Sequence, residues 1–191
     1  LNAAAMYPGL TADDLYVNAK VPFGFNYVDR NLDLKHLIKS DGSHDDHGSH
    51  VAGIATANKY INYDGEYRTE ELGVVGVAPD AQLFVMRVFG KNGGANSDDY
   101  MAAIEDAIIL GADSINLSLG SASAGESAEG AAYVDEIFDR LQGSDTLVVI
   151  SAGNSGSFAD HSTYGASLTT DVAVDTVGSP GSYTNAFTVA R

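Results

Sequence analysis

Mostly apolar runs of strand length alternate with helical patterns along the second half of this chain, and this alternation limits the choice of fold. The runs cover residues 83–89, 115–119 and 146–150, and the helical patterns lie between them at 97–111 and 127–141. Strands without regular polar alternation are buried on both faces, which is typical of a parallel sheet covered by helices. The order strand, helix, strand, helix, strand therefore predicts a three-layer α/β fold, with a parallel sheet between helices on both faces.

The two expected helices each carry an apolar face. Ser97 is a suitable N-cap, two acidic residues follow it in the first turn, and Gly111 closes the segment. Met101, Ile104 and Ile108 fall at spacings that place them on one side of this first helix. On the second helix, the shared apolar face consists of Tyr133, Ile137, Phe138 and Leu141.

Shorter elements are expected outside this core. Residues 21–28 and 186–190 each predict a strand, and the small residues of 51–57 suit a buried helix packed closely against a sheet. Residues 58–72, in which Asn, Tyr, Asp and Glu alternate, predict a surface loop. The length of 191 residues predicts one domain, with the boundaries 1–191.

Charge and composition exclude several classes of partner and site. The formal net charge is −16, from 26 acidic and 10 basic residues, so a phosphate backbone would be repelled and nucleic acid is not an expected partner. The absence of cysteine excludes disulfides, thiolate metal sites and a cysteine nucleophile. No apolar run reaches the roughly 18 residues that a membrane span requires. Such a charge is typical of a protein that is soluble outside the cell.

The segment 47–53 opens the expected small-residue helix with a histidine, His47. The positive end of the helix dipole disfavours a protonated ring, which keeps the imidazole neutral as a general base requires. Gly48 would let the backbone pack tightly there, and His50 points into the same region without needing to touch a substrate. His47 is therefore a candidate general base.

The segment 149–156 ends a buried strand with a sharp turn. In parallel sheets, functional residues gather beyond the carboxyl ends of the strands, which is where this turn falls. Ala152 and Gly153 leave room for a bulky substrate side chain, and Asn154 presents an amide N–H donor. A donor of this kind can stabilise the oxyanion of a tetrahedral intermediate, so Asn154 is a candidate oxyanion residue.

The histidine-rich stretch also allows a different chemistry. His44, Asp45, Asp46 and His47, together with His50, place three imidazoles and two carboxylates close together in the sequence. Imidazole and carboxylate groups suit zinc and similar divalent ions, so a metal site is an alternative to the general base.

Four segments, in this order along the chain, resemble successive landmarks of the subtilisin-like serine proteases. The resemblance covers nearly the whole chain and favours the general base over the metal site, so no metal ligand is assigned. The four segments are 47–53, 76–81, 114–120 and 151–156. Two further stretches, 17–21 and 160–165, are similar to the cell-envelope branch that includes the streptococcal C5a peptidases and the lactocepins.

The resemblance implies a role for each matching residue. His47 would be the general base and Asn154 the oxyanion donor, facing one another across a groove at the top of one parallel sheet. An extended peptide or protein substrate would pair as an added strand with a strand of the enzyme. Such pairing uses the substrate backbone, which explains why these enzymes place few requirements on the substrate sequence. The residues implied in substrate binding are Ser118, Leu119 and Gly120 for the backbone and Ala152 and Gly153 for the pocket.

Two parts of the family pattern are missing. The triad aspartate should lie in an apolar strand upstream of His47, and the serine in Gly-Thr-Ser-Met-Ala; neither motif occurs, and the acidic residues before His47 lie in the wrong context. We therefore expect a partial, incomplete catalytic domain that is inactive in isolation and belongs with the remaining parts of a longer protease. The alternatives are a non-catalytic, peptide-binding relative and a histidine-based metalloenzyme. The acidic residues concerned are Asp13, Asp14, Asp29 and Asp33.

The same resemblance sets the expectations for cofactors and location. No cofactor is required for triad chemistry. Acidic loops could bind structural calcium, as in related proteases, but no Asp-x-Asp-x-Asp-Gly loop is present and solvated surface charge accounts better for most of these residues. The expected location is outside a bacterial cell, either secreted or attached to the cell wall.

Overall fold

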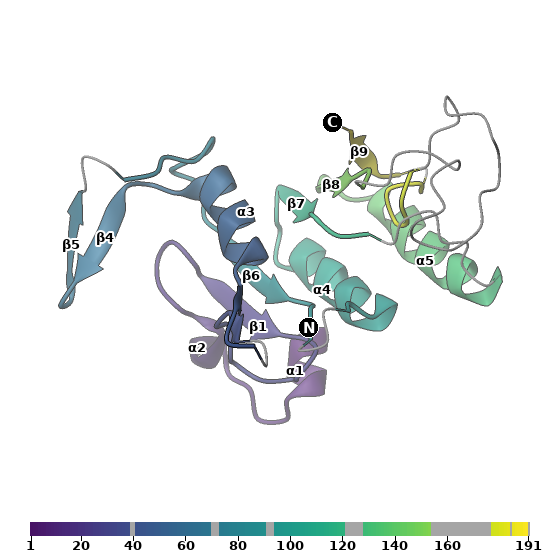
Figure 1. Ribbon diagram of the computed structural model, residues 1–191. Helices are drawn as coiled ribbons and strands as arrows, with labels where there is room; N and C mark the ends of the chain where they lie inside the picture. Colours follow the sequence, from purple (N-terminus) through teal and green to yellow (C-terminus); the bar gives the residue numbers. More distant parts are fainter. Residues whose placement is uncertain are drawn as a thin grey trace. The chain divides into compact units, whose positions relative to one another are not determined.

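Parallel strand pairing organises each of two units of the chain. The structure, a computed structural model, divides into a first unit, Leu1–Ala103, and a second unit, Ile104–Arg191. Helix α4 (Ser97–Ile109) contains the division between them. Figure 1 shows the elements of both. The residues described are 1–38, 41–69, 73–90, 94–120, 128–153, 177–183 and 185–190.

A parallel pair of strands forms the centre of the first unit. Strand β1 (Phe23–Asn26) pairs in parallel with β6 (Phe84–Arg87), which confirms both strands expected in this region. Every residue of β1 is buried. The rings of Phe25 and Tyr27 are fully buried and meet edge to face, with their centroids 5.0 Å apart. This aromatic cluster is why the strand lies inside the unit.

A buried amide and a guanidinium hold the turn after β1. The Asn26 side chain donates to the Asp29 carboxylate at 3.1 Å and to the Asp33 carbonyl at 3.1 Å, and it accepts from the Asp29 N–H at 3.0 Å. The Arg87 guanidinium on β6 lies 3.4 Å from the Asp29 carboxylate and donates to the Asp33 carbonyl at 3.1 Å. The Asp29 carboxylate and the Asp33 carbonyl therefore both bind Asn26 on β1 and Arg87 on β6.

Replacing Asn26 by alanine should lower the free energy of unfolding by about 2–3 kcal/mol, because the amide is fully buried and its bonds to Asp29 and Asp33 are lost. Urea unfolding followed by circular dichroism measures this change. The control is Asn62→Ala, which removes an exposed amide that accepts one bond from the Gly65 N–H at 2.9 Å. The control should change stability by less than about 1 kcal/mol, and equal effects would contradict the structural role of Asn26.

Two short helices precede β1. They are α1 (Asn2–Met6) and α2 (Ala12–Leu15). A capping box starts α2: the Thr11 hydroxyl accepts from the Asp14 N–H at 3.3 Å, and the Asp14 carboxylate accepts from the Thr11 N–H at 2.9 Å. The carboxylate also accepts the Thr11 hydroxyl, and these bonds hold the pKa of Asp14 below its usual value. Asp13 lies in the same helical turn, so the two acidic residues belong to this cap.

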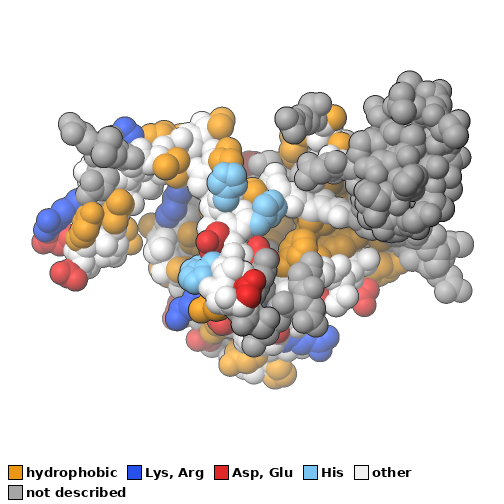
Figure 2. Space-filling view, viewed as in Figure 1, with side chains coloured by type: hydrophobic (Ala, Val, Ile, Leu, Met, Phe, Trp, Pro, Cys, Tyr) orange, Lys and Arg blue, Asp and Glu red, His pale blue; other side chains and the backbone are white. Residues whose placement is uncertain are grey.

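The prediction that residues 58–72 form a surface loop is wrong. Strands β4 (Tyr60–Tyr63) and β5 (Glu66–Thr69) form an antiparallel hairpin in which every residue is exposed. Its two turn residues, Asp64 and Gly65, both have positive φ angles, 50° and 92°, as a type I′ turn requires. The Asp-Gly pair is the signal that the polar composition concealed. Figure 2 shows apolar side chains on the surface of this hairpin, at the left of the view.

Helix α3 (His47–Thr56) follows a small antiparallel ladder of β2 (Leu37–Ile38) and β3 (His44–Asp45). The expected helix is confirmed, and it starts at His47, the residue expected to open it. The prediction that this helix is buried is wrong. Thr56 alone among the residues of α3 is buried, and the Ile54 side chain is 55% exposed. Small residues lower the cost of exposure, so they did not by themselves indicate a covered helix.

A three-stranded parallel sheet forms the second unit. Its strands β7 (Ser114–Leu117), β8 (Leu147–Ser151) and β9 (Phe187–Val189) lie in the order β7–β8–β9. Helix α5 (Ala128–Leu141) lies between β7 and β8 in the chain. All three strands and the helix were expected, and the α/β class with parallel strands is confirmed. No helix in the described ranges is both long and apolar enough to cross a membrane.

The apolar faces of the two long helices are close to those expected. On α4, Met101 and Ile104 are buried and Ile108 is half-buried. On α5, the prediction that Tyr133 belongs to the buried face is wrong. Its side chain is 43% exposed, and Val134 is fully buried instead. Val134 lies three, four and seven residues before the other buried positions, which is the better helical spacing. Those positions are Ile137, Phe138 and Leu141.

Candidate active site

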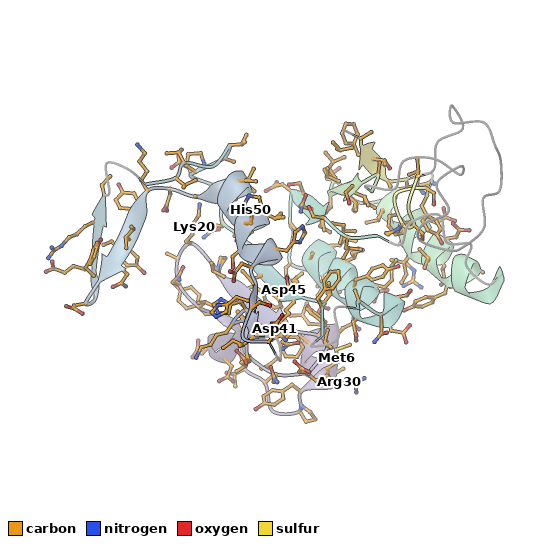
Figure 3. The ribbon with its side chains drawn as sticks, viewed as in Figure 1. Met6, Lys20, Arg30, Asp41, Asp45 and His50 are labelled. Carbon is orange, nitrogen blue, oxygen red and sulfur yellow. The ribbon has the colours of Figure 1, made fainter. Side chains whose placement is uncertain are left out.

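His47 is the first residue of helix α3, as the sequence predicted. The residue before it, Asp46, is the N-cap, and its carbonyl accepts the first helical bond from the His50 N–H at 2.9 Å. His47 is exposed, so its ring is accessible to a reacting group, and it lies at the positive end of the helix dipole. Figure 3 labels His50, which lies one turn further along the same helix and is also exposed.

The prediction that the backbone packs tightly at Gly48 is wrong. A Cβ built on Gly48 would meet no described atom within 4 Å. The close approach occurs instead at Gly76, where a Cβ would lie 2.5 Å from the Thr56 backbone nitrogen and 2.6 Å from that of Ala57. Only glycine allows the backbone to approach the end of α3 this closely.

The segment 76–78 satisfies backbone groups at the C-terminal end of α3. The last carbonyls of a helix have no partner within the helix, so their position depends on what donates to them from outside. Three successive N–H groups donate here, and the landmark segment therefore fixes the helix that carries His47. The bonds run from Gly76, Val77 and Ala78 to the carbonyls of Ala57, Ile54 and Ala55, at 2.8, 2.9 and 2.8 Å.

A lysine joins this landmark segment to the beginning of the chain. The Lys20 ammonium, labelled in Figure 3, donates to the carbonyls of Pro79 at 2.6 Å and Ala81 at 2.5 Å. The Lys20 carbonyl accepts from the Leu83 N–H at 2.8 Å. The stretches 17–21 and 76–81, which sequence analysis singled out separately, are therefore parts of one support beneath α3.

The variant Gly76→Ala should destabilise the chain by about 1–3 kcal/mol, because the added methyl group overlaps the backbone of α3 and the helix must shift. Thermal and urea unfolding measure the loss. Gly94→Ala is the matched control, since a Cβ at Gly94 meets nothing within 4 Å. If Gly76→Ala were as stable as Gly94→Ala, the contact with α3 would not position the helix.

A shallow hollow of about 360 Å³ lies at the other end of α3 from His47. Its lining includes Gly53, Asn58 and Tyr60. With a rise of 1.5 Å for each residue, the helix separates His47 from Thr56 by roughly 13 Å. This hollow is therefore distinct from the candidate catalytic position.

In the second unit, the residues implied in substrate binding gather at the carboxyl end of the sheet. Ser118 accepts from the Asn116 amide at 2.9 Å, and the Ser151 hydroxyl donates to the Leu119 carbonyl at 3.4 Å. The expected strand 115–119 ends earlier, at Leu117, so Ser118 follows the strand and is not within it. The residues brought to this edge are Ser118, Leu119 and Gly120 after β7, and Ala152 and Gly153 after β8.

The backbone beyond β8 is held from two sides. The Ala152 N–H donates to the Val189 carbonyl at 2.9 Å, and the Ala152 carbonyl accepts from the Gly178 N–H at 3.0 Å. Gly153 has a φ of 97°, which other residues adopt only with strain. The segment around Gly178 was not singled out from the sequence, although the run Gly-Ser-Pro-Gly at 178–181 is a turn signal that could have indicated it. A Cβ at Gly120 would lie 3.2 Å from the Ser179 carbonyl oxygen of that segment.

Two sequence expectations fall outside the described residues. Asn154, the candidate oxyanion donor, is one, and the stretch 160–165 is the other. His47 belongs to the first unit, and the residues at the edge of β7 and β8 belong to the second. The shared groove between His47 and Asn154 therefore stays a prediction.

Comparison with known proteins identifies relatives for nearly the whole chain. The model of the subtilase family (peptidase S8) matches residues 15–191. The chain is 40% identical over 180 residues to the PIII-type proteinase of Lactococcus lactis subsp. cremoris (strain SK11), covering 92% of this chain and 8% of that protein. It is 34% identical over 205 residues to the C5a peptidase of Streptococcus pyogenes, covering 100% of this chain and 15% of that protein.

A solved structure has the same fold. The crystal structure of a lanthipeptide protease superimposes with a TM-score of 0.55 at 22% sequence identity, over 94% of this chain and 43% of that chain. At this identity the likeness concerns the fold alone. The chain thus spans less than half of that chain and at most 15% of the two relatives named above.

Proposed function

The chain belongs to the subtilase family, and from this membership we propose that its protein is a serine endopeptidase that hydrolyses peptide bonds of extracellular proteins. The resemblance drawn from the motifs is confirmed by the family match and by relatives that are proteinases and a C5a peptidase. The observation that carries the proposal is the place of His47. It is an exposed histidine at the first position of a helix, inside the matched range, where a general base is accessible to a substrate.

In the proposed mechanism, His47 takes the proton from a serine hydroxyl as that oxygen attacks the peptide carbonyl. It then donates the proton to the leaving amine. An aspartate orients the imidazole and stabilises its charged form. We propose that this aspartate and the serine lie in parts of the protein outside these 191 residues, since the relatives are many times longer. The 191 residues alone are expected to hydrolyse no peptide.

We propose that an extended peptide binds beside β7, at the carboxyl end of this strand. Gly120 is exposed, so a substrate backbone can approach it closely. Ala152 and Gly153 at the end of β8 carry little or no side chain, which leaves space for a substrate side chain. Backbone pairing would supply affinity, and this small-residue pocket would supply selectivity.

Replacing His47 by alanine in the full-length protein should abolish cleavage of an unfolded protein substrate, because the general base is lost. Release of peptides from a fluorescently labelled casein measures the activity. His50→Ala is the matched control, since it removes an exposed histidine one turn along the same helix. Undiminished cleavage by His47→Ala would end the assignment. A wild-type protein that binds the peptide without cleaving it would favour the alternative, a non-catalytic peptide-binding relative.

Replacing Asn154 by alanine in the full-length protein should lower kcat by about 10²–10³ with little change in KM, which is the known effect of removing an oxyanion donor in enzymes of the subtilisin type. The amide acts mainly on the charge that develops in the transition state, so ground-state binding is little affected. Steady-state kinetics on a peptide substrate separate the two constants. A large rise in KM at unchanged kcat would assign Asn154 to substrate binding.

We propose that the protein acts outside the cell, either secreted or attached to a bacterial cell wall. The relatives named above come from Lactococcus and Streptococcus, and the chain carries a formal net charge of −16. Triad chemistry requires no cofactor. Structural calcium, bound by acidic loops, is a further expectation of this proposal.

A further inference from the structure

Two histidines and an aspartate gather just before helix α3. They are His36, His44 and Asp46, all exposed, and one potential ligand atom from each lies within 4.8 Å of the others. The antiparallel ladder brings them together, because Ile38 pairs with His44 and Leu37 pairs with Asp45. Figure 2 shows histidine and acidic side chains near one another on the visible face.

The spacing of these groups suits a small divalent ion. The His36 Nδ1 atom lies 3.3 Å from the Asp46 Oδ1 atom. Two ligands at the zinc distance of about 2.0–2.1 Å, separated by a tetrahedral angle, also lie roughly 3.3 Å apart. The His36 and His44 rings are 4.4 Å apart between centroids, so side-chain rotation can bring a His44 nitrogen to the same ion.

An ion pair between His36 and Asp46 is the simpler interpretation of the contact. Exposed ion pairs contribute little to stability, and these side chains are 41% and 60% exposed. Such a pair also gives no role to the second imidazole, His44, which the strand pairing places beside the first. Moreover, Asp46 is the N-cap of α3, yet its side chain makes no capping bond to the helix, although aspartate is a favoured cap. Its carboxylate is directed to the histidines instead.

We propose that His36, His44 and Asp46 bind a divalent transition-metal ion of the zinc class. Two imidazoles and one carboxylate are a ligand set that zinc accepts, with water completing four-coordination. Calcium and magnesium prefer oxygen ligands, so this site differs in kind from the calcium expected in acidic loops. His47 is not one of the three ligands, so metal binding and a general base are compatible in adjacent positions.

The test uses the full-length protein, dialysed free of transition metals in buffer with excess calcium, so that sites for hard cations are filled. Zinc binding is measured by isothermal titration calorimetry, and cobalt(II) is added separately to record visible absorption. The wild-type protein should bind zinc at this site and show the intense visible bands of tetrahedral cobalt. His36→Ala should lose the cobalt bands and lower zinc affinity by more than about 10–100-fold, the range seen when only an outer partner of a zinc ligand is removed.

His50→Ala is the matched control. His50 belongs to the histidine cluster that is visible in the sequence, whereas His36 joins the site only through strand pairing. The control should keep both the zinc affinity and the cobalt spectrum. Equal binding by wild-type and His36→Ala, or loss of the site in His50→Ala alone, would overturn the proposal. Metal binding is measured without any assay of peptidase activity. A failure of this proposal can therefore be distinguished from a failure of the proposed function.

Discussion

The backbone contact between the segment 76–78 and the end of helix α3 is the constraint on which the candidate base depends. Three N–H groups of this segment donate to the helix, and Gly76 lies so close that no side chain fits. Lys20 holds the residues that follow this segment, through the carbonyls of Pro79 and Ala81. Since Thr56 alone among the residues of α3 is buried, these bonds are a larger part of its support than they would be in a buried helix.

The two ends of α3 therefore have different tasks. Its C-terminal end is anchored by backbone bonds, while its N-terminal end presents His47 to solvent directly after Asp46. An anchored end and an open end suit the proposed function, in which the helix holds a general base at a fixed place and still admits a substrate. The histidines and the carboxylate before His47 lie on the open end, where an ion can reach them.

The second unit also combines an anchored part with an exposed part, here at the end of a sheet. The segment beginning at Gly178 donates to Ala152, and Ser151 donates to Leu119, so the ends of β7 and β8 are joined by bonds that do not use the exposed Gly120. A substrate strand needs an edge that is rigid but uncovered. Gly153, with its positive φ, ends the backbone described beyond β8 in a conformation that favours glycine.

The sequence by itself determined most local elements: the five parallel strands of the described residues, the helix that starts at His47 and the apolar face of α4 follow from periodicity and caps, which act over a few neighbouring residues. The Asp64-Gly65 pair is also a local signal for a hairpin turn, although the polar composition around it is typical of a loop. Only the tertiary structure decided that Gly76 packs on α3, that Val134 replaces Tyr133 in the core, and that His36 lies beside Asp46. These contacts depend on how distant backbone segments pair and on which helix face is covered, and no local pattern of residues specifies either.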